Sequence, residues 1–371
     1  MNNRNQFSHR RAFISFLIFV GVSSLVFILW SWQKLNTEEA EEIFIPDNVN
    51  YFNSSQKPLA VIFIHTCKGT FERIVTIEHT WSQHPLILNG TFKIELIVAN
   101  DVKRHSEFPI VEVGCTHERI DATCRFQSAY NYFYQKYPSV PFLFSADDDI
   151  WLNLDNLYKY IQNLMRIYNP FENLVFKGHA NLERTKLYFL HGGCGWLMSN
   201  CYIKFVIENN ISLNDYFPYS RYRQPDTSQS IIVRRIFKHI YEWDEYHMQG
   251  FECKTCAPDI ILNNNYELLP KCGNHKVYGR VNDIISFHTI SWGNVGFTIA
   301  RHIGSLPSWV LFEKINKIQG VILCKEIKNV TKVADWSVES LKKRAKLLKP
   351  SDIKLPLTDF SKLKDEHFLN Y

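Results

Sequence analysis

The chain has 371 residues, 15% of them aromatic, and a formal net charge of +5. This length is enough for one large domain with an appendage, or for two domains, and the aromatic content predicts a substantial core. The charge is modest and the only basic cluster, Lys342 to Arg344, is short, which argues against a nucleic-acid partner.

Residues 12–32 form an uncharged apolar segment long enough to cross a hydrocarbon core of about 30 Å. Three arginines precede it, which predicts that residues 1–11 are cytoplasmic and that the bulk of the chain lies across the membrane: Arg4, Arg10 and Arg11. A cleaved signal peptide would have a shorter apolar region that ends in small residues. Here the segment ends in Trp30 and Trp32, so we expect a type II anchor that binds the lipid bilayer.

The rest of the chain is expected to be lumenal. Residues 33–57 are polar and predict a stem, residues 58–300 a globular domain, and residues 301–371 an extension of unknown role. Four N-glycosylation sequons would be usable only in a lumenal domain. They begin at Asn53, Asn89, Asn210 and Asn329.

Apolar runs and helical periodicity alternate through the first half of the domain. Strands are predicted over 58–65, 92–99 and 140–144, and helices over 70–81, 121–137 and 153–168. This alternation predicts an α/β fold, with a mostly parallel sheet and helices on both of its faces. Such sheets bind ligands outside the carboxyl ends of their strands.

Asp147, Asp148 and Asp149 directly follow the third predicted strand. Three successive carboxylates repel one another, and a divalent cation would relieve that repulsion. Hard oxygen ligands suit Mg²⁺ or Mn²⁺, which complete their coordination with substrate phosphates. A solvated acidic turn is the alternative, because carboxylates also favour helix N-termini.

Three motifs of the second half have both a functional and a purely structural interpretation. Gly192 and Gly193 would allow a close approach to a ligand or form a tight turn. Asp226 would be a site carboxylate or the N-cap of the apolar helix that follows it. His288, in an apolar strand, would ligate a metal or be a hydrogen-bonded core histidine.

Nine cysteines fit an oxidising compartment. Cys115 and Cys124 flank a short loop before a helix and are plausible disulfide partners. A second group has the spacing of a structural zinc site, although disulfide pairing is the alternative. It consists of Cys253, Cys256, Cys272 and His275.

Between about Pro58 and Ile290, the ordered set of motifs resembles the Fringe-like, family 31 inverting β-1,3-glycosyltransferases, which include the Fringe enzymes and the core 1 galactosyltransferases. A type II anchor with a stem also matches that family's Golgi enzymes, so the Golgi or ER membrane is the expected location. The pieces that carry the resemblance are Thr66, Glu72-Arg73 and Thr80-Trp81; Cys115 and Cys124; Ser145 to Leu154; Gly178 to Arg184; Gly192 to Ser199; Pro225-Asp226; and Ser286 to His288.

The resemblance implies a GT-A-like fold, a UDP-sugar donor (GlcNAc or Gal), an Mn²⁺ cofactor and a glycan or glycoprotein acceptor. It implies Asp149 and His288 as metal ligands and Asp226 as the catalytic base. The implied donor-binding residues are Thr66, Arg73, Asp147, Asp148, Gly192 and Gly193. Thr227 replaces the second acidic residue of the family's usual pair after Pro225.

This chemistry needs few groups. A bound metal neutralises the departing diphosphate, and one carboxylate on the opposite face of the sugar accepts the proton of the acceptor hydroxyl. Two alternatives remain: a membrane-tethered binding protein of the same fold without turnover, and a receptor-like ectodomain in which the aspartate triplet binds Ca²⁺ or is a solvated turn. The alternation of strands and helices disfavours the second.

Overall fold

The computed structural model describes ten ranges of the chain: residues 58–78, 81–100, 105–116, 118, 121–182, 188–216, 225–237, 248–250, 285–288 and 337–359. The chain divides into two units, Met1–Pro46 and Asp47–Tyr371, and every described element belongs to the second. The predicted anchor, the stem and the possible zinc site lie outside the described residues. Within them, no helix is both long and apolar enough to cross a membrane.

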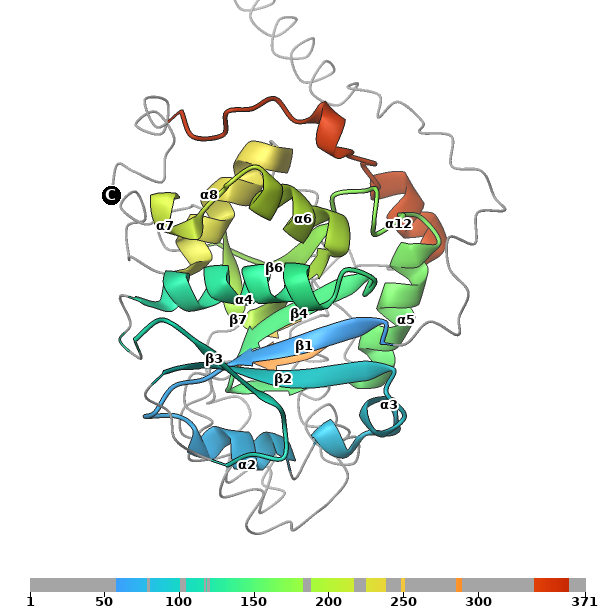
Figure 1. Cartoon of the computed structure of the whole chain (residues 1–371). Helices are drawn as coiled ribbons and strands as arrows, with labels where there is room; N and C mark the ends of the chain where they lie inside the picture. The colour runs from blue at the N-terminus through green and yellow to red at the C-terminus, as the bar shows by residue number, and fades with distance from the viewer. Residues whose placement is uncertain are drawn as a thin grey trace, which may run out of the picture. The chain divides into compact units, whose positions relative to one another are not determined.

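A six-stranded mixed sheet organises the domain (Figure 1). The strand order is β3-β2-β1-β4-β7-β6. The strands β3, β2, β1 and β4 are parallel to one another, as expected, whereas β7 runs antiparallel to both β4 and β6. The bounds are β1 Ala60–His65, β2 Phe92–Ala99, β3 Ile110–Val113, β4 Phe142–Asp147, β6 Phe176–Leu182 and β7 Tyr188–Ser199.

The central strands are apolar on both faces. All six residues of β1 are buried, as expected of a parallel strand that is covered on each side. Val61 and Phe63 share a core with one face of α4 and with residues of α6 and α8. Figure 1 shows α4 and α6 on one side of β1 and β2, and α2 and α3 on the other.

Seven α-helices lie in the described residues from 58 to 237, and four of them match segments predicted as helical, whereas α3, α6 and α7 were not predicted. They are α2 Glu72–Glu78, α3 Pro85–Leu88, α4 Ala122–Lys136, α5 Leu154–Met165, α6 Asn200–Glu208, α7 Leu213–Tyr216 and α8 Pro225–Phe237, with a 3-10 turn at Trp81–Gln83. Side-chain caps define two of the starts. Asn153 accepts a hydrogen bond from the amide of Asn156 at α5, and Ser199 accepts one from the amide of Tyr202 at α6.

A second, three-stranded sheet begins immediately after the aspartate triplet. Its order is β5-β9-β8, with bounds β5 Ile150–Leu152, β8 Met248–Gly250 and β9 Ser286–His288. Strands β5 and β9 are antiparallel, and the backbone of His288 lies opposite Ile150. The triplet therefore forms the corner between the two sheets.

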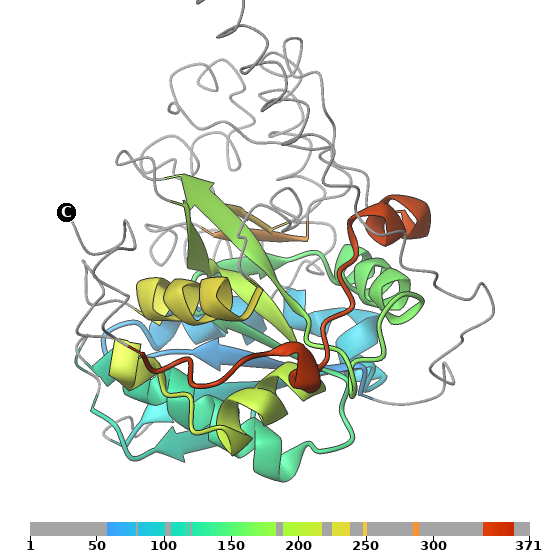
Figure 2. The same ribbon diagram turned by 90° about the horizontal axis from the view of Figure 1, so that it is seen from above.

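Residues 337–359 pack against the domain, as the red segment in Figure 2 shows. This segment contains α12 Val338–Arg344 and a 3-10 turn at Pro350–Asp352. The amide of Leu174 donates to the carbonyl of Leu348 over 2.7 Å, and Leu357 is buried in the core beside Tyr216. Part of the predicted extension thus contributes to the same hydrophobic core.

The predicted pairing of Cys115 with Cys124 is confirmed as a disulfide. It ties the end of β3 to the first turn of α4. Cys67, Cys194 and Cys201 are thiols. Burial raises the pKa of Cys201 to about 12, so that thiol stays protonated at neutral pH.

A fully buried glutamate on β2 anchors the end of α4. Glu95 Oε1 lies 2.8 Å from the ammonium of Lys93 and accepts a hydrogen bond from the hydroxyl of Tyr137. Burial opposes ionisation, but the hydrogen bonds and charges of these partners hold the pKa of Glu95 below its ordinary value. Such a lowered pKa stabilises the fold above the ordinary glutamate pKa of about 4.3, and this stabilisation is lost as the pH falls.

We expect Glu95→Gln to lower the free energy of unfolding at pH 7 by about 1–3 kcal/mol, because it weakens charge-assisted hydrogen bonds. The deficit relative to the wild type should shrink below about pH 4. Urea unfolding at several pH values measures both effects. Glu112→Gln, at an exposed position on the neighbouring strand β3, is the matched control. A deficit that stays constant down to pH 3 would contradict the assigned role of the Glu95 charge.

Candidate active site

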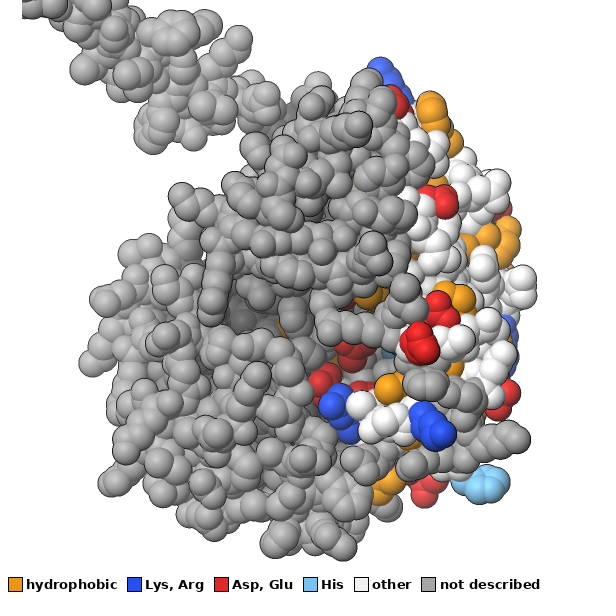
Figure 3. Space-filling model, turned by 90° about the vertical axis from the view of Figure 1, so that its left-hand side faces the viewer, with side chains coloured by type: hydrophobic (Ala, Val, Ile, Leu, Met, Phe, Trp, Pro, Cys, Tyr) orange, Lys and Arg blue, Asp and Glu red, His pale blue; other side chains and the backbone are white. Residues whose placement is uncertain are grey.

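A pocket of about 280 Å³ opens at the carboxyl ends of β1 and β4. The register places His65 of β1 beside Asp147 of β4, so the residues after both strands meet there. Figure 3 shows acidic and basic side chains gathered in a hollow of the face on view. The pocket is lined by His65, Thr66, Cys67, Thr70, Arg73, Ala122, Arg125, Phe126, Asp147, Asp148, Asp149, Pro225 and Asp226.

Asp148 accepts hydrogen bonds at both of its carboxylate oxygens. The hydroxyl of Thr66 donates to its Oδ2 over 2.7 Å, and the hydroxyl of Thr70 donates to the same oxygen. Arg73 donates from Nη1 to its Oδ1 over 2.9 Å. Burial raises the pKa of Asp148, an effect that Arg73 and the two hydroxyls oppose. The carboxylate therefore joins the segment after β1 to the corner after β4.

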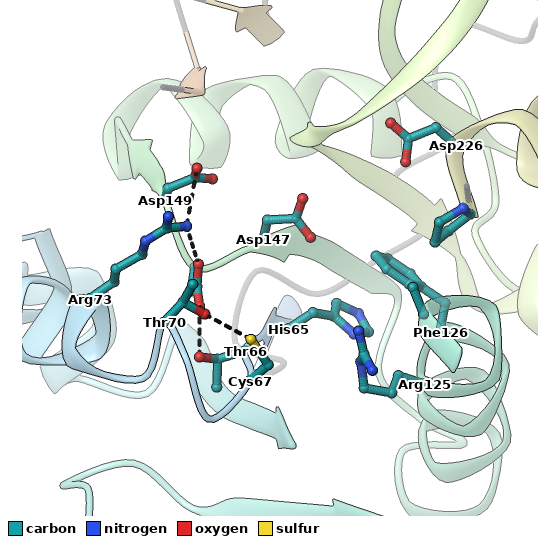
Figure 4. Close-up of a pocket in the computed structure, with 13 residues that line it drawn as sticks. His65, Thr66, Cys67, Thr70, Arg73, Arg125, Phe126, Asp147, Asp149 and Asp226 are labelled. Carbon is teal, nitrogen blue, oxygen red and sulfur yellow. Dashed lines mark hydrogen bonds and ion pairs between the residues drawn. The ribbon is translucent and has the colours of Figure 1, made fainter. Parts of the chain in front are cut away.

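Arg73 also reaches the third aspartate, because the same Nη1 lies 3.3 Å from Oδ2 of Asp149 (Figure 4). Burial opposes protonation of Arg73, but the charges of Asp148 and Asp149 raise its pKa above the ordinary value. The guanidinium therefore stays charged between two nearly buried carboxylates. Trp81 fixes the far side of this corner by donating from Nε1 to the carbonyl of Ile150 over 3.1 Å.

His65 forms a neutral wall of the pocket. Its Nε2 lies 2.8 Å from the hydroxyl of Ser145, and its ring stacks on Phe126 with centroids 3.7 Å apart. Burial, with a smaller contribution from the charge of Arg125, lowers the pKa of His65 to about 3. This histidine is therefore uncharged at any physiological pH and does not supply protons there.

Asp226 reaches the same pocket from the start of α8. It is the second residue of the helix, after Pro225, so the interpretation of Asp226 as the N-cap is wrong. Its Oδ2 instead accepts a hydrogen bond from the amide of Gly192 on β7 over 3.1 Å. Figure 4 shows the carboxylates of Asp147 and Asp226 turned toward the same space.

Gly192 and Gly193, for which a tight turn was one of two interpretations, lie within strand β7 at a register shift in its pairing with β6 and do not form a turn between elements. A Cβ atom at Gly192 would lie 2.6 Å from Oδ1 of Asp226 and 3.0 Å from Cζ2 of Trp196. Gly195 has φ of +88°, and a Cβ atom there would lie 2.3 Å from Phe144. Glycine is required at these two positions for close packing inside a strand, and at Gly195 also for its positive φ.

Six of the predicted site residues line the pocket: Thr66, Arg73, Asp147, Asp148, Asp149 and Asp226. Gly192 adjoins it through Asp226, whereas Gly193 lies in β7 and is not part of the lining. The backbone of His288 lies opposite Ile150, the residue after the triplet, but its side chain lies outside the description. Sequence reasoning missed His65, Cys67, Thr70, Arg125 and Phe126. His65 ends the first predicted strand and Cys67 lies two residues beyond it, whereas the other three lie in segments predicted as helices.

The described residues contain no group of three or more His, Cys, Asp or Glu side chains that could hold a metal. Asp147 and Asp149 nevertheless suit Mg²⁺ or Mn²⁺, which proteins bind through one or two carboxylates while substrate phosphates and water complete the coordination. The guanidinium beside Asp149 shows that this corner accommodates positive charge. The residues present thus fit a divalent cation that is shared with a ligand.

Comparison with known proteins gives structural similarity only. No family model matches the chain, and no curated protein matches it by sequence. Similar solved structures include a glycosyltransferase involved in the glycosylation of the major capsid of PBCV-1, at 12% identity and a TM-score of 0.38, which covers 65% of this chain and 98% of that one. The apo form of the glycosyltransferase GlyE of Streptococcus pneumoniae TIGR4 gives 15% identity, a TM-score of 0.39 and coverage of 76% and 66%.

The galactosyltransferase LgtC, in complex with donor and acceptor sugar analogues, is similar at 10% identity and a TM-score of 0.36, over 64% of this chain and 94% of that one. At these identities the similarity concerns the course of the backbone. The resemblance to the Fringe-like group therefore stays a prediction, and the function proposed below rests on the side chains of the pocket.

We expect Gly192→Ala to lower the free energy of unfolding by about 1–3 kcal/mol, because the added methyl group overlaps the carboxylate of Asp226. The cost should fall in an Asp226→Ala background, which removes that carboxylate, so urea unfolding of the four proteins should show coupling of about 0.5–3 kcal/mol. Gly114→Ala, where a Cβ atom meets nothing within 4 Å, is the control. Strictly additive effects would show that the two residues do not touch.

Proposed function

We propose that this protein is an Mn²⁺-dependent inverting glycosyltransferase of the Fringe-like group. It would transfer GlcNAc or galactose from a UDP-sugar to a hydroxyl of a glycan or glycoprotein, in β-1,3 linkage. The observation that carries this proposal is the meeting in one pocket of Asp147 and Asp149, from the end of β4, with Asp226, from the start of α8. The two roles that need a carboxylate, metal binding and proton acceptance, would then be filled from different sides of the same pocket.

The donor side of the pocket is the triplet corner. Asp147 and Asp149 would hold the metal, with His288 as a further ligand in the proposal, and Arg73 lies close enough to contribute charge toward a diphosphate. When bound, the metal would neutralise the negative charge that develops on the leaving diphosphate. In place of the donor contact predicted for it, Asp148 would hold the corner in place, because the hydroxyls of Thr66 and Thr70 both donate to its Oδ2.

The acceptor side is Asp226. An inverting transfer needs a base on the face of the sugar opposite the leaving group, within hydrogen-bond reach of the attacking hydroxyl. The amide of Gly192 holds Oδ2 of Asp226 and so fixes the direction in which the carboxylate points. The carboxylate would accept the proton as the acceptor oxygen forms its bond to the sugar carbon and the UDP oxygen leaves.

A second candidate is a binding protein of the same fold without turnover. The feature that favours it is Thr227, which stands where the family's usual pair has a second acidic residue. Thr227 is buried, whereas Asp226 lines the pocket. A single carboxylate is sufficient for general-base catalysis, so we retain the transferase as the proposal.

The proposed location is the Golgi or ER membrane, with residues 12–32 as a type II anchor and the active site in the lumen. The disulfide between Cys115 and Cys124 supports an oxidising compartment. Two of the four sequon asparagines, Asn89 and Asn210, are exposed on the described surface and thus accessible to glycosylation.

We expect Asp226→Asn to lower the rate of sugar transfer by about 10²–10⁴-fold, because an amide cannot accept the proton, while Mn²⁺ and UDP binding persists. Product formation from radiolabelled UDP-sugar measures the rate, and calorimetry measures binding. Asp149→Asn should lose binding as well as transfer. Asp215→Asn, an exposed carboxylate on α7, is the control.

Transfer by Asp226→Asn at the wild-type rate would show that another group is the base. Wild-type protein that binds UDP but transfers no sugar, under any tested donor and acceptor, would favour the binding protein.

We expect N-linked glycans on Asn89 and Asn210, since a lumenal domain would expose both sequons to the oligosaccharide transferase. Each of Asn89→Gln and Asn210→Gln should increase the electrophoretic mobility of protein expressed in mammalian cells. Endoglycosidase treatment should remove the difference between the variants and the wild type. A protein that carries no glycan at any sequon would contradict the lumenal topology.

A further inference from the structure

Arg73 places its positive charge between two of the three aspartates of the triplet, Asp148 and Asp149. Its Nη1 atom lies 2.9 Å from Oδ1 of Asp148 and 3.3 Å from Oδ2 of Asp149. Both carboxylate side chains are about 5% exposed, and that of Arg73 is 23% exposed. One guanidinium thus compensates two buried carboxylates, and its side chain remains partly exposed to solvent.

A divalent cation on Asp149 would meet this guanidinium at short range. Like charges a few ångströms apart repel strongly where water is largely excluded. The repulsion would be relieved if the guanidinium turned toward an anion, and a diphosphate that is bound to the same cation supplies that anion. Arginine suits this exchange, because the geometry of its planar group matches both carboxylates and phosphates.

We propose that Arg73 is a resident counterion of the metal site, which compensates Asp149 in the empty pocket and moves to the diphosphate when metal and nucleotide bind together. This inference rests on the proposed function. It adds that the binding of metal and the binding of nucleotide are coupled through Arg73. Metal alone binds weakly, because it must displace Arg73 from Asp149. Metal and nucleotide therefore strengthen the binding of each other, and the coupling is reciprocal.

The corner can keep its shape without Arg73. Thr66 and Thr70 both donate to Oδ2 of Asp148, and Trp81 holds the carbonyl of Ile150. Removal of the guanidinium therefore leaves the turn anchored while it removes the group that would compete with a cation for Asp149. A purely structural role for Arg73 predicts the opposite, that metal binding weakens when the residue is lost.

The test compares Mn²⁺ binding to the full-length wild type and to Arg73→Gln, with and without saturating UDP. Electron paramagnetic resonance of free Mn²⁺ gives the affinity, and thermal unfolding monitors the fold. In the absence of UDP, Arg73→Gln should bind Mn²⁺ about tenfold more tightly than the wild type, within the range of typical coupling between sites. The factor by which UDP strengthens Mn²⁺ binding should fall by a similar amount. Arg73→Lys, which keeps the charge, should stay close to the wild type.

Lys68→Gln is the matched control, because it removes one positive charge from an exposed position in the same segment. An equal gain in Mn²⁺ affinity in Lys68→Gln would overturn the proposal, as would an unchanged or weaker affinity in Arg73→Gln. Asp149→Asn distinguishes this failure from failure of the proposed function. If the wild type binds Mn²⁺ and Asp149→Asn binds it equally well, the metal site lies elsewhere and the proposed function itself fails.

Discussion

The site depends on how the fold compensates carboxylates at the end of a buried strand. Strand β4 delivers three successive aspartates to a corner where two of them are almost fully buried. Uncompensated, such charges would cost several kcal/mol each. The segment after β1 supplies the compensation through Thr66, Thr70 and Arg73, and it can do so because β1 and β4 are parallel neighbours in register. The sheet topology therefore places these hydrogen-bond donors beside the buried carboxylates.

The side of the pocket that holds Asp226 is stabilised in a different way. Asp226 stands in the first turn of α8, where the helix dipole favours negative charge, and the amide of Gly192 orients it. A second contact joins the same elements, because Ser230 accepts from the amide of Leu190 and donates to the carbonyl of Asp226. The amide of Gly192 thus orients this carboxylate through a backbone dipole, which is compatible with accepting a proton.

Periodicity and apolar runs were sufficient to predict β1, β2, β4, α4 and α5, because these elements bury continuous or periodic apolar faces. The rule that ligands bind at the carboxyl ends of parallel strands located the triplet, and applied to β1 it would have found His65 and Thr70 as well. The two interpretations of the glycine motif could not be separated from the sequence, because the close contact between Gly192 and Asp226, 34 residues apart, is a property of the tertiary structure. The partners of Asp148 could not be predicted for the same reason.

Strand β7 connects the two sides of the pocket. It pairs with β4, where Trp196 lies opposite Ser145, and four residues earlier its Gly192 amide holds Asp226. Ser145 in turn bonds His65, which lies beside Asp147 in the register. Four positions of β7 thus separate the residue that pairs with Ser145 from the residue that orients Asp226, and they lie at the register shift between β7 and β6. The contacts of Trp196 and Gly192 therefore hold the two groups of carboxylates through one continuous segment of chain, which suits the proposed transfer because that reaction would depend on orientation.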